Sequence, residues 1–145
     1  MTKRQVRIAH CYRCVHTWRM RYRLPRVCPR CKSRRWNVPK IRPIEIGTGL
    51  GVEEILGPHR GEILRLARRY GARNVRVFGS IRRRQADERS DADLLLEWKK
   101  GTSSLDTATF RIHLKRLLGR DVDTVEDAFL HWAIRPQILA EAVSL

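Results

Sequence analysis

The sequence predicts an α/β protein, of the α+β kind, in which a small layered domain follows a cysteine-bearing N-terminal module. Three observations carry this prediction. Residues 58–145 show the order helix, strand, strand, helix, strand, helix, which is typical of a small layered structure. Residues 11–31 hold all four cysteines in two C-x2-C pairs. Residues 41–57 are punctuated by proline and glycine, which is typical of a linker between domains.

The two cysteine pairs predict a structural metal site in a module spanning residues 1–40. Thirteen residues separate the pairs, so each can form a tight knuckle, and together they can present four sulfurs in the tetrahedral geometry of structural zinc. The ligands would be Cys11, Cys14, Cys28 and Cys31. The module resembles a zinc ribbon, in which Zn²⁺ supplies most of the folding free energy. A rubredoxin-like iron site uses the same ligands, but Val15 and Lys32 stand where that family usually has glycine.

Positive charge is concentrated at the N-terminus. The 145 residues carry a net charge of +16, and residues 1–44 hold 14 basic residues and no acidic one. The remaining 17 basic and 15 acidic residues nearly balance. Such an asymmetry predicts a polyanionic partner, RNA or DNA. Residues 18–24 alternate apolar and basic side chains, which predicts a strand with one charged face, and Trp18, Tyr22 and Trp36 offer surfaces for base stacking.

The sequence shows no secretory signal and no apolar run near the roughly 20 residues that span a bilayer. We therefore expect a cytoplasmic protein with no membrane partner. In that compartment the cysteines are expected to bind metal rather than to form disulfides.

Apolar spacing predicts two helices in the larger domain. Pro58 suits the first turn of a helix that ends at Gly71. Its buried face would consist of Ile63, Leu66, Ala67 and Tyr70. Ser103 and Asp106 form a capping pair that opens a second helix, which extends to about residue 118.

Three strands and a last helix complete this domain. The strands are expected at residues 74–78, 91–98 and 121–125. Pro136 opens the last helix. The residues of this helix expected to face inward are Leu139, Ala142 and Val143.

One motif joins the first two of these strands. The first strand runs into Gly79-Ser80, and ten residues later Asp91 and Asp93 open the next strand. Alternation along a strand puts both carboxylates on one face. Two carboxylates beside a glycine turn with a hydroxyl can hold Mg²⁺ against a triphosphate. The motif therefore predicts phosphoryl or nucleotidyl transfer.

The motif resembles the nucleotidyltransferase superfamily that includes DNA polymerase beta, and within it the minimal nucleotidyltransferases. Their pattern is Gly-Ser, about ten residues and then Asp-x-Asp, and the resemblance covers residues 58–145. It implies a nucleotidyltransferase fold with a small mixed sheet flanked by helices. It also implies a third carboxylate within residues 118–125, as well as Mg²⁺ and ATP or another nucleoside triphosphate.

The resemblance assigns roles to the acids and to the turn. Asp91 and Asp93 would ligate Mg²⁺, and Asp123 would hold the catalytic metal and help to deprotonate the acceptor. Gly79 would let the backbone approach the phosphates, and Ser80 would donate hydrogen bonds to them. Asp121 shares a strand face with Asp123 and is the alternative third carboxylate; the family places this acid just after an apolar residue, which favours Asp123.

Three arginines lie between the turn and the acids. Arg82 and Arg83 would form a phosphate clamp together with Arg84, because guanidinium groups bind phosphate in a bidentate manner. The alternative is a solvated basic loop. Many family members have a glycine near the place of Arg84.

Three alternatives concern the molecule that accepts the nucleotide. The resemblance implies transfer of AMP from ATP to a protein hydroxyl by the antitoxin of a toxin–antitoxin pair, with a HEPN-type toxin as the partner. The basic module instead favours a nucleotidyltransferase that acts on RNA and grips its backbone. A third alternative is a nucleic-acid-binding zinc ribbon protein whose transferase scaffold is inert.

Overall fold

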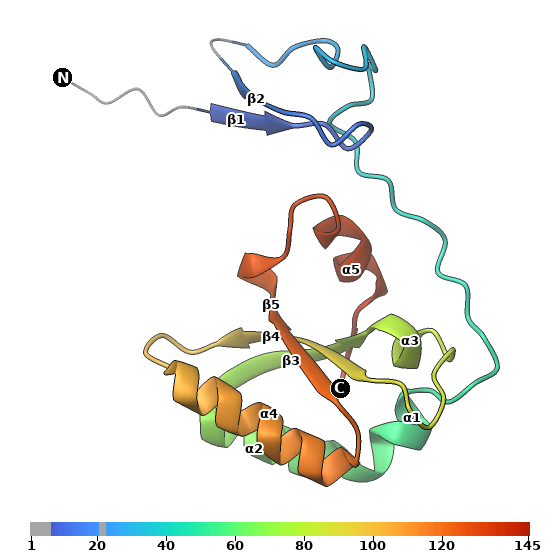
Figure 1. The fold of residues 1–145 in the computed structure, drawn as a ribbon, viewed down its shortest axis with the longest axis vertical. Helices are drawn as coiled ribbons and strands as arrows, with labels where there is room; N and C mark the ends of the chain where they lie inside the picture. Colours follow the sequence, from blue (N-terminus) through green and yellow to red (C-terminus); the bar gives the residue numbers. More distant parts are fainter. Residues whose placement is uncertain (1–6, 21–22) are drawn as a thin grey trace. The chain divides into compact units, whose positions relative to one another are not determined.

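The computed structural model describes residues 7–20 and 23–145. The chain divides into two compact units, Met1–Arg42 and Pro43–Leu145 (Figure 1). Within the described part of the chain, none of the helices combines the length and the apolar character that crossing a membrane requires.

The smaller unit is built on a hairpin. Strand β1 (Arg7–His10) pairs antiparallel with β2 (Thr17–Met20), and the first cysteine pair lies in the loop between them. Strand β2 overlaps the predicted strand at residues 18–24 over residues 18–20; residues 21–22 lie outside the described residues, and residues 23–24 are not in a strand. The core of this unit consists of Ala9, Cys11, Cys28 and Trp36.

The larger unit contains a mixed four-stranded sheet in the order β5-β4-β3-β6. Strand β3 (Ala72–Phe78) is antiparallel to both β4 (Ala92–Trp98) and β6 (Val143–Ser144). Strand β5 (Val122–Glu126) is parallel to β4 and forms one edge of the sheet. The predicted α/β class with a small mixed sheet is thereby confirmed.

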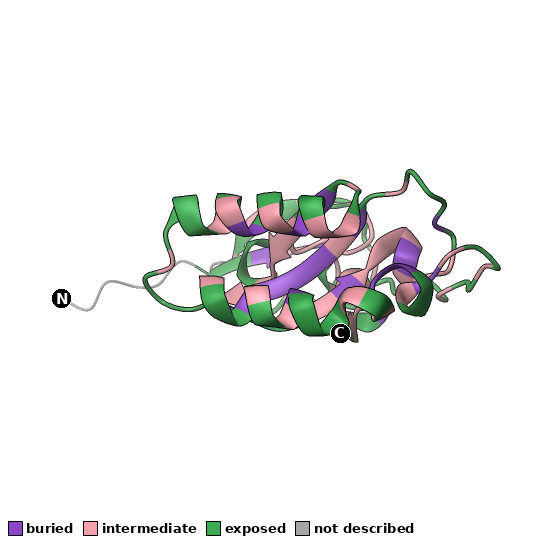
Figure 2. Ribbon diagram, turned by 90° about the horizontal axis from the view of Figure 1, so that it is seen from below, coloured by how far each residue is buried: buried purple, intermediate pink, exposed green. Residues whose placement is uncertain are grey.

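Two long helices cover one face of this sheet. Helices α2 (Arg60–Tyr70) and α4 (Ser104–Leu118) lie side by side beneath the strands, with their buried residues turned toward the sheet (Figures 1 and 2). Their buried side chains pack against alternate residues of the strands, as the period of two in a strand requires. The residues in this layer include Ile63, Ala67, Phe110, Leu114, Val77, Leu94 and Leu96.

The ends of these helices follow from local chemistry. The N–H of Asp106 donates to Ser103 Oγ over 3.1 Å, and the Ser103 N–H donates back to Asp106 Oδ2, which confirms the predicted capping pair. Helix α2 ends at Gly71, whose φ of 80° is the left-handed conformation that glycine adopts without strain.

Shorter elements connect these parts. Helix α1 (Val52–Ile55) and the 3-10 turn η1 (Gly57–His59) precede α2, and α3 (Gly79–Arg82) follows β3 directly. The 3-10 turn η2 (Asp127–Phe129) follows β5. Helix α5 (Arg135–Glu141) lies on the face of the sheet opposite to α2 and α4 (Figure 1).

The end of the chain differs from the prediction. Helix α5 contains Pro136 in its first turn as expected, but it ends at Glu141, so the assignment of Ala142 and Val143 to its inner face is wrong. Val143 instead lies in β6, opposite Val77 of β3. The backbone becomes extended at Ala142 because the last residues gain sheet hydrogen bonds there, including one from the Leu145 N–H to the Val75 carbonyl over 3.1 Å.

The glycines of residues 41–57 mark close packing. The Gly47 N–H donates to the Arg83 carbonyl over 2.7 Å, and a Cβ at Gly47 would lie 2.6 Å from the Arg84 carbonyl oxygen. Leu56 is fully buried in the core of the larger unit. From Gly47 onward, this segment therefore belongs to the larger unit, and its glycines allow two backbones to approach each other.

Candidate functional site

The Gly79-Ser80 turn is held against Asp93. Strand β3 ends at Phe78, which lies opposite Asp93 in the antiparallel register, and Gly79 then opens α3 with a φ of 75°. A Cβ at Gly79 would collide with the Asp93 carboxylate. Only glycine satisfies both the left-handed backbone and this close approach. The turn and the acid, which lie apart in the sequence, therefore form one site.

Two of the predicted acids are also direct neighbours across the sheet. Asp93 of β4 lies opposite Asp123 of β5 in the parallel register. Asp91 lies immediately before β4, where the N–H of Ala92 donates to the carbonyl of Asp121 over 2.9 Å. Asp91 and Asp123 are exposed, whereas Asp93 is half-buried. The sheet therefore brings the predicted carboxylates to one end of β4 and β5.

The surroundings of Asp93 favour a bound cation. Burial, the largest cause, raises the pKa of Asp93 above its ordinary value, and the charges of Asp123 and Asp91 raise it further. Arg83 lowers this pKa, and Glu141 adds a smaller increase. A divalent cation would relieve this repulsion, and carboxylate oxygens are the ligands that Mg²⁺ prefers. The donor set therefore fits the expected metal.

Basic side chains of α4 pair with Asp123 of β5 and with Asp121, which precedes β5. Arg111 Nη2 lies 3.4 Å from Asp123 Oδ1, and Lys115 forms an ion pair with Asp121. Asp121 lies one residue before β5, so the register brings Asp123 rather than Asp121 opposite Asp93. Among the described residues, carboxylate oxygens do not gather as tightly as the cysteine sulfurs described below.

The three arginines after the turn have different partners. Arg83 Nη1 donates to Glu141 Oε1 over 2.8 Å, and Arg82 Nε donates to the Glu141 carbonyl over 3.0 Å. Arg84 instead forms an ion pair of 2.6 Å with Glu54. Its φ of 54° is the left-handed conformation that glycine adopts most easily.

Glu141 was missed by the sequence reasoning. Its carboxylate is 5% exposed and accepts a hydrogen bond of 2.6 Å from the N–H of Gly79. The sequence carried no signal for this contact, because the predicted inner face of the last helix consisted of Leu139, Ala142 and Val143 and did not include Glu141.

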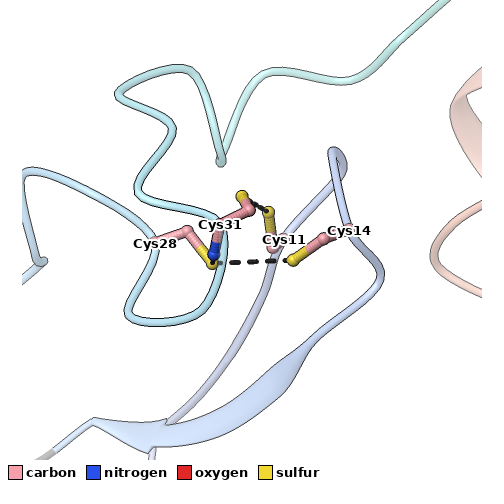
Figure 3. Close-up of side chains that lie close together, drawn as sticks. All are labelled: Cys11, Cys14, Cys28 and Cys31. Atoms are coloured by element: carbon pink, nitrogen blue, oxygen red, sulfur yellow. Dashed lines mark hydrogen bonds between the residues drawn. The ribbon is translucent and has the colours of Figure 1, made fainter.

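The four cysteine sulfurs converge in the smaller unit, as Figure 3 shows, and all lie within 4.8 Å of one another. The Sγ atoms of Cys11 and Cys31 are 3.7 Å apart, as are those of Cys14 and Cys28. Each sulfur can supply one thiolate, and four thiolates form the closed shell of a structural zinc site. The cluster fits the predicted metal centre.

Both knuckles have the same backbone geometry. The N–H of Val15 donates to the Cys11 carbonyl over 2.9 Å, and the N–H of Lys32 donates to the Cys28 carbonyl over 3.0 Å. Val15 has a φ of 61° and Lys32 a φ of 59°, so both adopt the left-handed conformation at the places where glycine is usual in rubredoxin-like sites. This conformation is unfavourable for the β-branched Val15, which indicates that the knuckle imposes it.

The thiols are electrostatically unequal. Burial raises the pKa of Cys28, but the backbone N–H groups of Cys31 and Arg30, together with the side chains of Cys31 and Cys11, outweigh this effect and lower the pKa to about 7. Burial is the main cause that raises the pKa of Cys14 to about 11, and the neighbouring sulfurs add to it. A bound cation would stabilise all four thiolates together, because it replaces protons at each sulfur.

Trp36 belongs to the core of this unit, and Trp18 packs against that core. Trp36 is 4% exposed, and its Nε1–H donates to the Pro25 carbonyl over 3.0 Å. It packs edge-on against Trp18 with the ring centroids 4.9 Å apart. The prediction of Trp36 as a surface for base stacking is therefore wrong, and Tyr22 lies outside the described residues.

A family model described as "Nucleotidyltransferase domain" matches residues 62–145. The chain belongs to this nucleotidyltransferase family. The protein adenylyltransferase MntA of Thermococcus cleftensis is 37% identical over 92 residues, which cover 63% of this chain and 90% of MntA.

Solved structures show the same relationship to the nucleotidyltransferase family. A structure described as a minimal nucleotidyltransferase is 41% identical, with a TM-score of 0.59, over 68% of this chain and 100% of its own. A toxin–antitoxin structure with AMP-PNP is 19% identical, with a TM-score of 0.51, over 58% of this chain and 69% of its own. The latter likeness concerns the fold alone.

Proposed function

We propose that this nucleotidyltransferase transfers AMP from ATP to a hydroxyl group of a partner protein. One observation carries the proposal. Asp93 lies opposite Asp123 in the parallel register and also against the Gly79 turn, so the carboxylates and the Gly79-Ser80 turn share one site. The name of the similar MntA, a protein adenylyltransferase, supports a protein as the acceptor.

The site residues divide the work of this reaction. Asp91, Asp93 and Asp123 would hold Mg²⁺, which when bound neutralises charge on the triphosphate and aligns the reacting oxygens. The Asp93 carboxylate fills the space where a Cβ at position 79 would lie, so Gly79 lets the turn lie directly against the acids, and the hydroxyl of Ser80 can donate to a phosphate oxygen.

Asp123 would take the proton of the acceptor hydroxyl, and Arg83 would stabilise the charge that develops on the leaving pyrophosphate. Asp123 lies at the exposed end of an edge strand, where it can accept the proton of an approaching acceptor hydroxyl. The acceptor oxygen bonds to the α-phosphorus, and the bond from that phosphorus to the bridging oxygen of pyrophosphate breaks. Arg83 can stabilise the charge on the departing phosphates, since its side chain is 33% exposed.

We further propose a structural zinc site in the smaller unit and a toxin as the partner protein. The four cysteines would hold a structural Zn²⁺ in a ribbon spanning residues 1–40, with residues 58–145 as the transferase domain. We extend the toxin–antitoxin pairing of the structure with AMP-PNP to this chain, with a HEPN-type toxin as acceptor.

A second candidate function is supported by the charge of the smaller unit. Its exposed basic residues include Arg19, Arg26, Arg30, Arg34 and Arg35. Side chains of this kind can neutralise phosphates of an RNA backbone. The second candidate is therefore a nucleotidyltransferase that modifies RNA held by this unit.

The test is transfer of α-labelled ATP in the presence of Mg²⁺ to a HEPN-type toxin and to RNA, with the full chain and its Asp93→Asn variant. The proposal predicts label on the toxin that is lost in the variant. Label on RNA would support the second candidate instead. A wild-type chain that binds RNA but labels neither acceptor would contradict both and favour an inert scaffold.

A further inference from the structure

Helix α5 carries a buried carboxylate directly behind the Gly79-Ser80 turn. Glu141 is 5% exposed, and its Oε1 accepts hydrogen bonds from the Gly79 N–H over 2.6 Å and from Arg83 Nη1 over 2.8 Å. Its backbone carbonyl also accepts from Arg82 Nε over 3.0 Å. One residue near the C-terminus thus contacts three residues of the segment that follows β3.

The burial of Glu141 needs an explanation. A buried carboxylate is costly unless it is paired and hydrogen-bonded, and an apolar residue of similar volume often stabilises a protein as well or better. Glu141 also adds negative charge near Asp93, where carboxylates already repel one another. Stability alone therefore does not explain why a carboxylate occupies position 141.

The contacts of Glu141 fix the backbone of the Gly79 turn and the guanidinium of Arg83. The Gly79 N–H is held in the conformation that brings this residue against Asp93. Arg83 is held at Nη1 by Glu141 and at Nε by Gln85 over 2.9 Å. A guanidinium has five N–H donors, so donors remain for a phosphate after these two bonds are made.

We propose that Glu141 is a positioning residue for the triphosphate: it fixes the Gly79 turn and orients the Arg83 guanidinium before the nucleotide binds. This inference rests on the proposed function. Glu141 is too buried to touch the nucleotide itself and acts through Arg83 and the turn. An arginine already held in place loses less side-chain entropy on binding, and this raises affinity for the phosphates.

The test is binding of a non-hydrolysable ATP analogue with Mg²⁺ to the full chain, measured by calorimetry. Glu141→Gln keeps the length of the side chain and an acceptor for Gly79, but it removes the charge that holds Arg83. We expect its Kd to rise about ten- to a hundredfold, the range for hydrogen bonds to charged groups. The control Glu62→Gln removes an exposed carboxylate of α2 and should leave the Kd unchanged.

A double-mutant cycle separates positioning from general damage. If Glu141 acts through Arg83, the double variant Arg83→Gln with Glu141→Gln should bind no more weakly than Arg83→Gln alone. In steady-state transfer, Glu141→Gln should raise KM for ATP more than it lowers kcat, because the lost contact serves nucleotide binding. Penalties that simply add, or an unchanged Kd in Glu141→Gln, would overturn the inference.

The outcomes also separate this inference from the proposed function. A wild-type chain that binds the analogue but labels no acceptor would contradict the proposed function and leave the role of Glu141 to the binding data. A wild-type chain that does not bind the analogue would overturn both. If Glu141→Gln does not fold, Arg83→Gln alone decides, since analogue binding as tight as in the wild type would exclude a phosphate contact by Arg83.

Discussion

Asp93 and Asp123 lie opposite each other on adjacent parallel strands, although 29 residues of the sequence lie between them. Asp93 is half-buried and Asp123 is exposed at the edge of the sheet. One carboxylate is therefore fixed within the protein, while the other faces the space from which an acceptor can approach. This difference gives the two acids separate expected roles.

Replacement of Asp93 by asparagine should stabilise the metal-free protein while abolishing transfer. The pKa of Asp93 is raised in the folded state, so the folded protein binds this proton more tightly than the unfolded chain does. Its contribution to stability is therefore greatest at low pH and falls as pH rises through the folded pKa. At neutral pH without added Mg²⁺, Asp93→Asn should raise Tm by roughly 2–4 °C after allowance for solvent screening.

Asp87→Asn is the matched control for this measurement, with the opposite sign. The hydrogen bond from Ser90, the largest cause, lowers the pKa of Asp87, and the Arg89 N–H contributes. Its ionised form therefore stabilises the fold above the unfolded pKa, and its replacement should lower Tm. A decrease in Tm for Asp93→Asn at neutral pH would contradict the repulsion inferred around that acid.

The third carboxylate can be identified by comparing two variants of one strand. Asp123→Asn should lower kcat by about a hundredfold or more, as loss of a metal-binding and proton-accepting group requires. Asp121→Asn should change kcat by less than about threefold, because Asp121 forms an exposed ion pair with Lys115 and such a pair contributes little free energy. The measurement is the initial rate at saturating ATP. Equal losses of kcat in the two variants would show that the strand register does not determine which acid is the third carboxylate.

Removal of one thiolate should release zinc and unfold only the smaller unit. Cys28→Ser removes a ligand of low pKa, and the small core of this unit cannot compensate for the lost metal. Zinc content and backbone amide spectra would report this, with signals of residues 43–145 retained. His16→Asn is the control, since four thiolates already complete the shell. Loss of zinc in that variant would count against the four-cysteine site.

Arg84→Gly should leave the free energy of unfolding within about 0.5 kcal/mol of the wild type. Glycine relieves a left-handed backbone, worth about 1 kcal/mol, and this offsets the loss of the half-exposed pair with Glu54. Arg84→Ala loses the pair and keeps the same unfavourable backbone, so it should be less stable than the wild type by up to about 1 kcal/mol, the contribution of the pair. Urea unfolding measures both, and equal effects of glycine and alanine would refute the backbone argument.

Much of the site was visible in the sequence because its signals are local. The Gly79-Ser80 turn, the Asp91 and Asp93 spacing and the two cysteine pairs each lie within a few residues, where strand alternation and ligand spacing determine what is close. The capping pair at Ser103 and Asp106 was predicted for the same reason and is confirmed. Val15, Lys32 and Arg84, which stand at places where glycine was expected, adopt a left-handed backbone in the structure.

The sequence by itself determined the family pattern, the strands that carry the acids and the paired cysteines. Tertiary structure alone decided which residues complete the site. The contact between Gly79 and Glu141 joins residues 62 positions apart, and Arg84 pairs with Glu54 across 30 positions. No periodicity encodes such contacts, because they arise only when the sheet orders its strands and α5 packs on its open face. The glycines of residues 41–57 suggested a linker in the sequence, but in the structure Gly47 and Gly49 allow two backbone segments to lie close together.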